Sequence, residues 1–302
     1  MAGSPALSIV IAVEDGAANV PAWLDAVNGV GCDVEVLFGC AGSIPDQLSC
    51  ASVTAFSCPR TALVPLLWSE GILRARGNAV ALTTSQFVPD PRWLARLAKV
   101  DLKRWVGVGG AIDNDPQSSP MNWAVFFLRY SAFMPPLKAG ETVEIAADNA
   151  VYDRAAVLAH PDLLADGFWE PSFHRRFRAA GAKLALDPEL LVIYRGTLTP
   201  RDFAWRRYLH GRAYGIERAE RAGLARNAGL LLSSPFVTPL LLARTLSRIS
   251  RRSHYRTSLA RALPLLARFT LAWNVGEASG YALVLAKRIQ GGVSRFRRRH
   301  AQ

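Results

Sequence analysis

The sequence lacks the features that identify several classes of protein at once. Its four cysteines lie between residues 32 and 58, and their spacing gives neither a Cys-x-x-Cys pair nor a zinc-ligand pattern. The first residues, MAGSPALSIVIAV, contain no basic segment and no signal cleavage site. We therefore expect reduced thiols that serve as small core residues in a cytosolic protein, and a short tail that leads into a strand.

Acidic residues are almost absent from the end of the chain. Residues 244–302 contain 13 Lys or Arg and one acid, Glu277, so this part alone accounts for the net charge of +12. The charges of residues 1–243 sum to zero. Any inference about partners from the basic composition therefore applies to the tail alone.

Apolar runs that alternate with helical patterns fill the first two thirds of the chain. Strands are predicted at LSIVIAV (7–13), DVEVLFGCA (33–41), 79–84 and WVGVGGAI (105–112), and helices at 20–27, 63–77, 91–102 and 171–181. This order predicts an α/β fold with a mainly parallel sheet flanked by helices. Ligands of such sheets bind at the carboxyl ends of the strands.

Carboxylates are missing where one strand of this sheet ends. The strand over residues 79–84 runs into Thr84-Ser85-Gln86, which is followed by Pro-Asp-Pro and a helix. A polar step at this position lies at the edge where a ligand is expected, but its side chains are neutral.

Eight segments in order resemble the inverting glycosyltransferases of family 2, which have the GT-A fold. The similarity covers roughly residues 7–215. Its segments are LSIVIAV (7–13), EVLFGCAGS (35–43), GILRARGN (71–78), ALTTSQFVPDPRWL (81–94), VGGAIDN (108–114), AADNAVYDRAAV (146–157), GFWEPSFHRRFRAAGAKL (167–184) and FAWRRYLHGRAYG (203–215). Each segment is only moderately specific, and the order carries the resemblance.

The resemblance implies that Glu170 is the catalytic base. Trp169 and Glu170 take the place of the family's Glu-Asp pair, whose second acid removes the proton of the acceptor hydroxyl. The preceding residues, DGFW, suggest a partly apolar pocket that would raise the pKa of this acid. The alternative is an acid that stabilises a helix N-terminus.

Further site residues follow from the same resemblance, each beside a structural alternative. Glu14 and Asp15 would contact the nucleoside or serve as loop acids, and Arg76 would contact the nucleotide or stabilise a helix C-terminus. Asp148 and Asn149 would meet sugar or acceptor, or cap a turn. Trp169 and, from the segment WRRYLHGR, Arg206, Arg207, His210 and Arg212 would bind the diphosphate or the acceptor. A solvated helix face for some of the arginines and a structural role for the histidine remain open.

Thr84 and Gln86 stand where the family's metal-binding aspartates usually are, and the resemblance assigns them to the nucleotide sugar. Two other departures, at Cys40-Ala41 and near Tyr194, point the same way. Mg²⁺ and Mn²⁺ prefer oxygen ligands that include carboxylates. We therefore expect a metal-independent transferase, in which arginines and backbone dipoles stabilise the departing phosphate.

The tail, residues 229–302, is apolar and basic, and we expect it to be a separate helical region after a catalytic domain of residues 1–228. The run 263–286 is long enough to span a bilayer, but Arg268 and Glu277 argue against a simple span, and the run 229–243 is too short and contains two prolines. We expect helices that lie on an anionic membrane surface, on the cytoplasmic face, as in peripheral or monotopic proteins. GEASG (276–280) is a pattern of small residues that lets helices approach closely. Packing of these helices onto the catalytic domain is the alternative.

The sequence and the resemblance together predict an inverting transfer of a sugar from a nucleotide sugar to a lipid-linked or polysaccharide acceptor at the membrane. A catalytically degenerate glycosyltransferase that binds without turnover is one alternative. A protein that binds nucleic acid through its basic tail is another, although long aliphatic runs and few stacking aromatics favour lipid.

Overall fold

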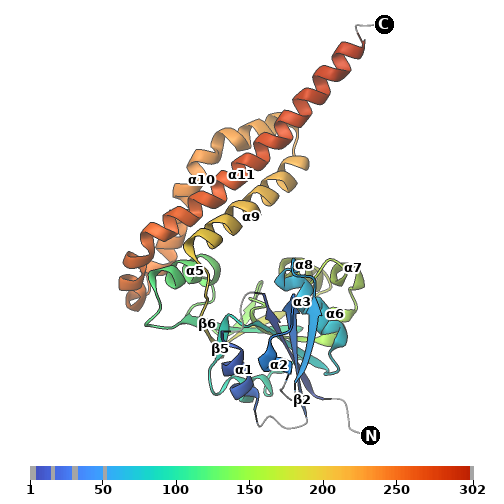
Figure 1. Ribbon diagram of the computed structural model, residues 1–302, viewed down its shortest axis with the longest axis vertical. Helices are drawn as coiled ribbons and strands as arrows, with labels where there is room; N and C mark the ends of the chain where they lie inside the picture. The colour runs from blue at the N-terminus through green and yellow to red at the C-terminus, as the bar shows by residue number, and fades with distance from the viewer. Residues whose placement is uncertain (1–4, 15–17, 29–32, 50–52, 300–302) are drawn as a thin grey trace. The chain divides into compact units, whose positions relative to one another are not determined.

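The computed structural model describes residues 5–14, 18–28, 33–49 and 53–299, and the side chains of these residues as far as 290. The chain forms two compact units. Residues 1–117 and 132–197 make up one, here the sheet unit, and residues 118–131 and 198–302 make up the other, here the helical unit. Each unit is described by itself (Figure 1).

The sheet unit is built on a nine-stranded mixed sheet. The strands are β1 Leu7–Val13, β2 Val34–Ala41, β3 Thr54–Cys58, β4 Ala79–Thr84, β5 Phe87–Pro89, β6 Gly107–Asn114, β7 Gly140–Thr142, β8 Asn149–Asp153 and β9 Leu184–Tyr194. Their order is β3-β2-β1-β4-β8-β6-β9-β5, with β7 paired to β9. Strands β1 to β4, β6 and β9 run one way, while β5, β7 and β8 run against their neighbours.

The central strands are apolar because both faces of the sheet are covered. All seven residues of β1 are buried, which the unbroken run LSIVIAV requires of a strand between two layers. The helices of this unit are α1 Val20–Val27, α2 Asp46–Ser49, α3 Val64–Arg74, α4 Trp93–Leu97, α6 Arg154–Leu158, α7 Pro161–Leu164 and α8 Glu170–Ala179.

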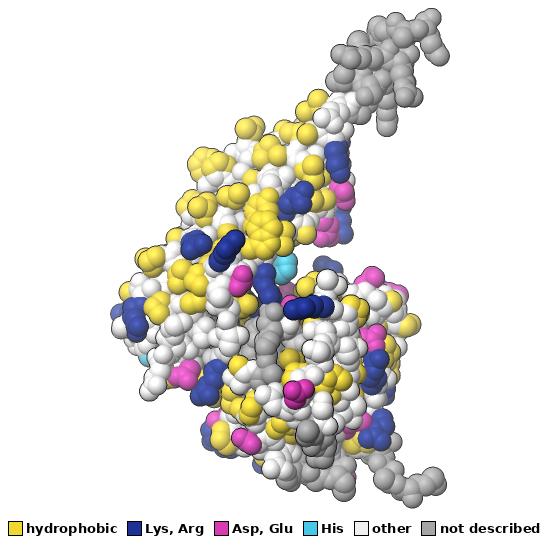
Figure 2. Space-filling view, viewed as in Figure 1, with side chains coloured by type: hydrophobic (Ala, Val, Ile, Leu, Met, Phe, Trp, Pro, Cys, Tyr) yellow, Lys and Arg dark blue, Asp and Glu magenta, His cyan; other side chains and the backbone are white. Residues whose placement is uncertain are grey.

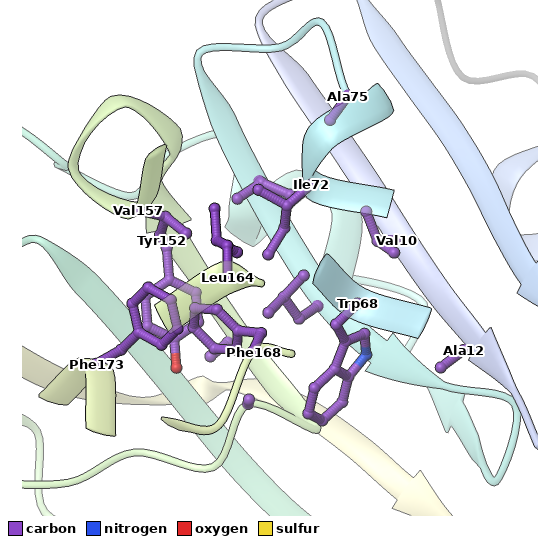
Figure 3. Packing of buried hydrophobic residues seen from close by; sticks show 14 of the residues in the cluster. Val10, Ala12, Trp68, Ile72, Ala75, Tyr152, Val157, Leu164, Phe168 and Phe173 are labelled. Carbon is purple, nitrogen blue, oxygen red and sulfur yellow. The ribbon is translucent and has the colours of Figure 1, made fainter. Parts of the chain in front are cut away.

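One core cluster joins the sheet to α3 and α8. Val10 and Ala12 of β1 lie beside Trp68 and Ile72 of α3, and the cluster continues to the aromatic rings of α8 and the loop before it (Figure 3). Phe168 stacks on Phe173 with ring centroids 4.4 Å apart. The start of α8 is therefore fixed by the same core that holds the sheet.

The predicted strands and the α/β class are confirmed. The predicted helix over residues 171–181 forms as α8, and Gly181 follows its end with φ of +78°, a conformation that favours glycine. The predicted helix over 91–102 is shorter than expected, since α4 spans Trp93–Leu97 only. Cys40 and Cys58 are free thiols, and burial and the neighbouring Cys58 raise the pKa of Cys40 to about 11, as expected of inert core residues. Cys32 and Cys50 lie outside the described residues.

The helical unit consists of α5 Pro120–Tyr130, α9 Pro200–Glu220, α10 Leu224–Ser250, a 3-10 turn at Ser253–Tyr255 and α11 Arg256–Arg299. Helices α9, α10 and α11 run side by side (Figure 1). An aromatic group closes one end of this unit, where Trp123, Phe126 and Phe127 of α5 surround Tyr255.

Glycines on both helices bring α9 and α11 into close contact. A Cβ atom on Gly211 or Gly215 of α9 would meet the backbone oxygen of Trp273 or Glu277 of α11. Conversely, a Cβ on Gly276 or Gly280 of α11 would meet backbone oxygens of α9. The close approach predicted for GEASG is confirmed, and GRAYG (211–215) supplies the matching half of the contact.

Packing of α11 explains the acid that the sequence places in an apolar run. Glu277 is 4 % exposed and lies 3.4 Å from the guanidinium of Arg218 on α9. It also accepts a hydrogen bond from the hydroxyl of Tyr281. The 263–286 run therefore belongs to a helix that packs against α9, α10 and α5, and its acid has a partner inside the protein.

The other apolar run is longer than the sequence indicates. The expectation that 229–243 is too short for a membrane span is wrong, because α10 continues through both prolines and covers 27 residues. Within the described residues, α10 is the one helix long and apolar enough to cross a membrane, by length and composition only. The boundary predicted between residues 228 and 229 differs from the division into units, since α9 packs with α11.

Candidate active site

The carboxyl ends of the parallel strands form one edge of the sheet, and most predicted site residues of this unit lie there. Thr84 ends β4, and Glu14 follows β1. Strand β8 runs opposite to β4 with Asn149 paired to Thr83, so Asp148, just before β8, lies at the same edge. Asp113 and Asn114 end β6 and lie at this edge too.

The polar step after β4 is held by backbone hydrogen bonds. Ser85 donates from its amide to the carbonyl of Ala12 at 2.9 Å, and the amide of Gln86 donates to the hydroxyl of Thr84 at 3.2 Å. The side chain of Asn19 donates to the carbonyls of Ser85 and Arg195, at 2.8 and 2.9 Å. The step is therefore a fixed part of the sheet edge.

The side chains of this step do not fit a divalent metal ion. Thr84 and Gln86 are 3 % and 9 % exposed, and they offer a hydroxyl and an amide in place of carboxylates. The amide oxygen of Gln86 is buried, with no hydrogen-bond partner in the described part of the chain. Among the described residues no group of three or more His, Cys, Asp or Glu is placed to hold a metal. A neutral donor set of this kind cannot balance a divalent charge.

Glu170 is the first residue of α8 and is half-buried. The loop before it is tied to the start of α3, since the amide of Phe168 donates to the carbonyl of Pro65 at 2.8 Å. Gly167 has φ of +102°, and any side chain there would press on the backbone of Pro65 and Leu66. The indole of Trp169 is 46 % exposed and donates to the carbonyl of Asp166. The predicted base thus stands at a fixed helix start with an exposed ring beside it.

A buried aromatic pair lies within electrostatic range of the carboxylates of Glu170 and Asp148. The hydroxyl of Tyr152 is 3.1 Å from Nε2 of His174, and both residues are almost completely buried. Burial, with added repulsion from Glu170 and Asp148, raises the pKa of Tyr152 well above its usual value. Burial and the charge of Arg178 lower the pKa of His174 to about 4.

Two conclusions follow from these shifts. Tyr152 and His174 are both neutral at physiological pH, so this pair supplies no counter-charge to the acids beside it. Glu170 and Asp148, which are 22 residues apart in the sequence, both act electrostatically on the hydroxyl of Tyr152.

Asn149 has a structural role, which corrects its assignment to the ligand. Its side-chain oxygen accepts from the indole of Trp93 at 2.8 Å. Its amide nitrogen donates to the carbonyls of Ala111 and Leu190, each at 2.8 Å. The side chain is fully buried and both N–H groups are used, so no donor is left for a sugar.

Arg76 lies at the wrong end of the sheet for a nucleotide contact, which is a second correction. Its guanidinium Nε and backbone amide donate to Glu35, at 2.7 and 2.8 Å, next to Ser8 and Gly77. Ser8, Glu35 and Ala79 are at the amino ends of β1, β2 and β4. With a strand rise of about 3.3 Å per residue, the carboxyl edge is roughly 17 Å away.

Glu35 is well compensated at that site. Burial would raise its pKa, but hydrogen bonds from the amide of Arg76, the hydroxyl of Ser8 and the guanidinium of Arg76 outweigh burial, so the pKa of Glu35 is lowered. Arg76 therefore acts in the structure as the partner of a partly buried acid.

The arginine-rich segment forms part of α9 in the helical unit. Arg207 is half-buried, its guanidinium lies 4.3 Å from the ring centroid of Trp273, and its Nε has no hydrogen-bond partner among the described residues. Burial and the charge of Arg129 lower the pKa of Arg207 to about 10. Burial and the charges of Arg207, Arg129 and Arg206 lower the pKa of His210. This cationic group of α5 and α9 is a place where an anion would be stabilised.

The predicted diphosphate role of the α9 residues stays a prediction. Arg206, Arg207 and His210 belong to the cationic group, whereas the backbone of Arg212 lies against Gly276 and Gly280 of α11. Glu14 is described at the end of β1, and Asp15 lies outside the described residues.

Several residues at this edge are not indicated by sequence reasoning. Arg195, just after β9, donates from its amide to the carbonyl of Gln86 at 2.7 Å, and its guanidinium is 3.3 Å from Asp115. It is an exposed cation at an edge that otherwise holds acids and neutral groups. Its position after an apolar strand was a usable signal. The Tyr152–His174 pair gives no such signal, since it forms only through packing.

Comparison with solved structures supports the fold. A mannosyltransferase from Pyrobaculum calidifontis, PcManGT, solved in complex with GDP-Man and Mn²⁺, matches with a TM-score of 0.52 and 14 % identity, covering 91 % of this chain and 87 % of that one. A structure described only as a mycobacterial protein matches with a TM-score of 0.45 and 15 % identity over 70 % of this chain and 73 % of that chain. No family model and no curated protein matches the sequence. The chain therefore has a GT-A-like glycosyltransferase fold, a mixed nine-stranded sheet flanked by helices and followed by a helical region.

Proposed function

We propose that the protein is an inverting glycosyltransferase of the family 2 type, which transfers a sugar from a nucleotide sugar to a lipid-linked or polysaccharide acceptor. The support is the position of Glu170 at the fixed start of α8 and of Asp148 at the carboxyl edge of the sheet, both acting electrostatically on the hydroxyl of Tyr152, in a chain with a GT-A-like fold. GDP-mannose is the first donor to test, because the solved mannosyltransferase contains it.

In this proposal Glu170 is the general base. Its carboxylate accepts the proton of the acceptor hydroxyl while the oxygen attacks the anomeric carbon. The bond from that carbon to the nucleoside diphosphate breaks on the opposite face, so the configuration inverts. Trp169, exposed beside the base, would provide an apolar surface for the acceptor sugar.

The leaving diphosphate needs positive charge, and the neutral step at Thr84 and Gln86 does not supply a metal site. We infer that a cationic side chain of the sheet unit replaces the ion, and Arg195, which stands at the carboxyl edge of the sheet, is the candidate. Guanidinium groups suit a diphosphate because they can donate two parallel hydrogen bonds.

The location is part of the proposal. Helix α10 is apolar, long and mostly exposed, which is weak support for contact with a membrane. We place the reaction at the cytoplasmic face of the membrane, where nucleotide sugars and lipid-linked acceptors meet.

The test is the release of a nucleoside diphosphate from a panel of nucleotide sugars by the full chain and by Glu170→Gln. The substitution keeps shape and removes the base, so turnover should fall about 10²–10⁴-fold while donor binding is kept. Glu144→Gln, an exposed acid outside this site, is the matched control and should leave turnover unchanged.

Two results would change the assignment. Loss of turnover in Asp148→Asn with normal turnover in Glu170→Gln would move the base to Asp148. Donor binding without turnover by the wild-type chain in every condition would favour a degenerate transferase that only binds.

A further inference from the structure

A hollow lined by arginines lies near the end of α10. Its volume is about 630 Å³, and it is lined by Ala243, Arg244, Ser247, Arg248, Arg251 and Arg252. No acid is among these residues, and in the described part of the chain none of the four arginines pairs with an acid. Four guanidinium groups around one hollow favour an anion that accepts several hydrogen bonds.

The arginines are of two kinds. Arg248 and Arg252 are anchored to α5, with guanidinium donors 3.3 Å from the hydroxyl and 3.2 Å from the carbonyl of Ser131. Arg244 and Arg251 each lack a hydrogen bond to any described residue, and both are exposed, as Arg248 is. The anchored pair shapes the hollow, and Arg244 and Arg251 remain available for a ligand.

The positive charges around the hollow lower the pKa of one of its arginines. Burial lowers the pKa of Arg252, and the charge of Arg248 lowers it further, against an opposing effect of Tyr255. Arginines near a helix C-terminus are favoured by the helix dipole, but that dipole amounts to about half a charge and cannot balance four cations.

The same face of α10 carries an exposed apolar stripe. Leu232, Phe236 and Leu240 are 78 %, 74 % and 52 % exposed. At 3.6 residues per turn, these residues and Ala243, Arg244, Ser247 and Arg251 fall within an arc of about 120°. Figure 2 shows hydrophobic side chains gathered over the helical unit, with Lys and Arg side chains among them.

The apolar stripe and the arginine hollow follow each other along α10 as the acyl chains and the phosphate do along a phospholipid. Apolar side chains come first along the helix, and the arginines follow one to three turns later. Arg244 and Arg251 fall within the arc of the stripe, whereas Arg248 and Arg252 lie beside it, at about 160° and 200° around the helix from Leu232. Acyl chains would contact the stripe while the phosphate of the headgroup enters the hollow. A free phosphate or a soluble nucleotide would use the arginines but leave the stripe in water.

We propose that the hollow of Arg244, Arg248, Arg251 and Arg252 binds the phosphate of an anionic membrane lipid whose acyl chains lie on Leu232, Phe236 and Leu240. The inference rests on the membrane contact of α10 in the proposed function and names the ligand of that contact, at a site that takes no part in the proposed chemistry. It assigns the membrane contact to one face of one helix.

The test is co-sedimentation of the full chain with vesicles of phosphatidylcholine, with and without phosphatidylglycerol, at physiological salt. Each arginine near an anionic surface contributes about 1 kcal/mol, or about fivefold, so Arg244→Gln with Arg251→Gln should weaken binding about 25-fold. Arg226→Gln with Arg261→Gln removes the same charge from exposed positions outside the hollow, and should weaken binding much less. Donor binding should be unchanged in both pairs, which separates this site from the transferase proposal.

A variant that keeps the positive charge tests whether the geometry of the guanidinium groups matters for vesicle binding. Arg244→Lys with Arg251→Lys should bind anionic vesicles more weakly than wild type, because lysine cannot donate in a planar fork. Equal binding of these lysine variants and wild type, together with equal losses in the two glutamine pairs, would overturn the site and leave only diffuse attraction.

Three other outcomes also overturn the proposal. Equal binding to vesicles with and without phosphatidylglycerol would mean that no headgroup charge is recognised. Binding of inorganic phosphate by the wild-type chain, without binding to anionic vesicles of equal phosphate content, would assign the hollow to a free anion. Tighter binding to a single-stranded oligonucleotide than to vesicles of equal phosphate content would assign it to nucleic acid.

Discussion

His174 makes the stability of the sheet unit depend on pH in a way that can be calculated. Burial and Arg178 lower its pKa from the ordinary 6.5 to about 4. In the folded state the ring is therefore neutral, while in the unfolded chain it binds a proton as the pH falls below about 6.5. The group contributes stability above that pH, and this contribution is lost as the pH falls towards 4.

The size of the loss follows from the shift. A difference of about 2.5 pKa units corresponds to about 3 kcal/mol in the free energy of unfolding once both states are protonated. Between pH 7.5 and pH 5 the part lost is about 2 kcal/mol, because the unfolded ring is by then almost fully protonated and the folded ring is not. This is a large share of the 5–15 kcal/mol that is typical of a domain.

The measurement is urea unfolding of the wild type and of His174→Gln at several pH values. Glutamine can still reach the hydroxyl of Tyr152 but does not titrate, so the difference between the two proteins isolates the histidine. The variant should be less stable at neutral pH and should lose about 2 kcal/mol less than wild type by pH 5. Phe177→Leu, which loosens the same core without removing a histidine, should lower stability at every pH and keep the wild-type slope. Parallel curves for wild type and His174→Gln would refute the reasoning.

Three further predictions follow from the site and the packing. Transfer should survive EDTA, and Mn²⁺ should change nucleotide affinity only slightly; complete loss in EDTA that Mn²⁺ restores would show a metal site that the residues at 84–86 do not reveal. Gly211→Ala should lower the melting temperature through a clash worth about 1–3 kcal/mol with the backbone of α11, whereas Gly229→Ala, with open space around it, should raise it slightly. Arg76→Ala should leave donor binding unchanged and cost at most about 1 kcal/mol in unfolding experiments, since the arginine is exposed; a large loss of donor affinity would restore its predicted role.

The sequence predicts the α/β core well because periodicity and apolar runs are local signals. Strand β1 is buried along its whole length, and the unbroken apolar run LSIVIAV alone predicts this burial. The position of Glu170 at a helix start is also local, since Pro171 and Gly181 bracket the helix.

The predictions that the structure corrects fail because they depend on contacts between distant parts of the chain. The motif GILRARGN assigns Arg76 to the nucleotide, but a helix that returns beside parallel strands ends at their amino edge, so topology places Arg76 away from the ligand. Asn149 has three partners on three other segments, and Glu277 pairs with a residue 59 positions earlier. Contacts of this kind depend on the packed structure, and no local pattern in a single sequence contains them.

The helical unit is assembled from two distant parts of the chain, and this affects how the protein folds during synthesis. The rings of Trp123, Phe126 and Phe127 are almost fully buried around Tyr255, which is translated about 130 residues later. At about 5–20 residues per second, α5 waits for roughly 7–26 s without the partner that covers it. During that interval the nascent chain exposes an aromatic cluster, and a chain that stops after residue 228 keeps those rings without Tyr255.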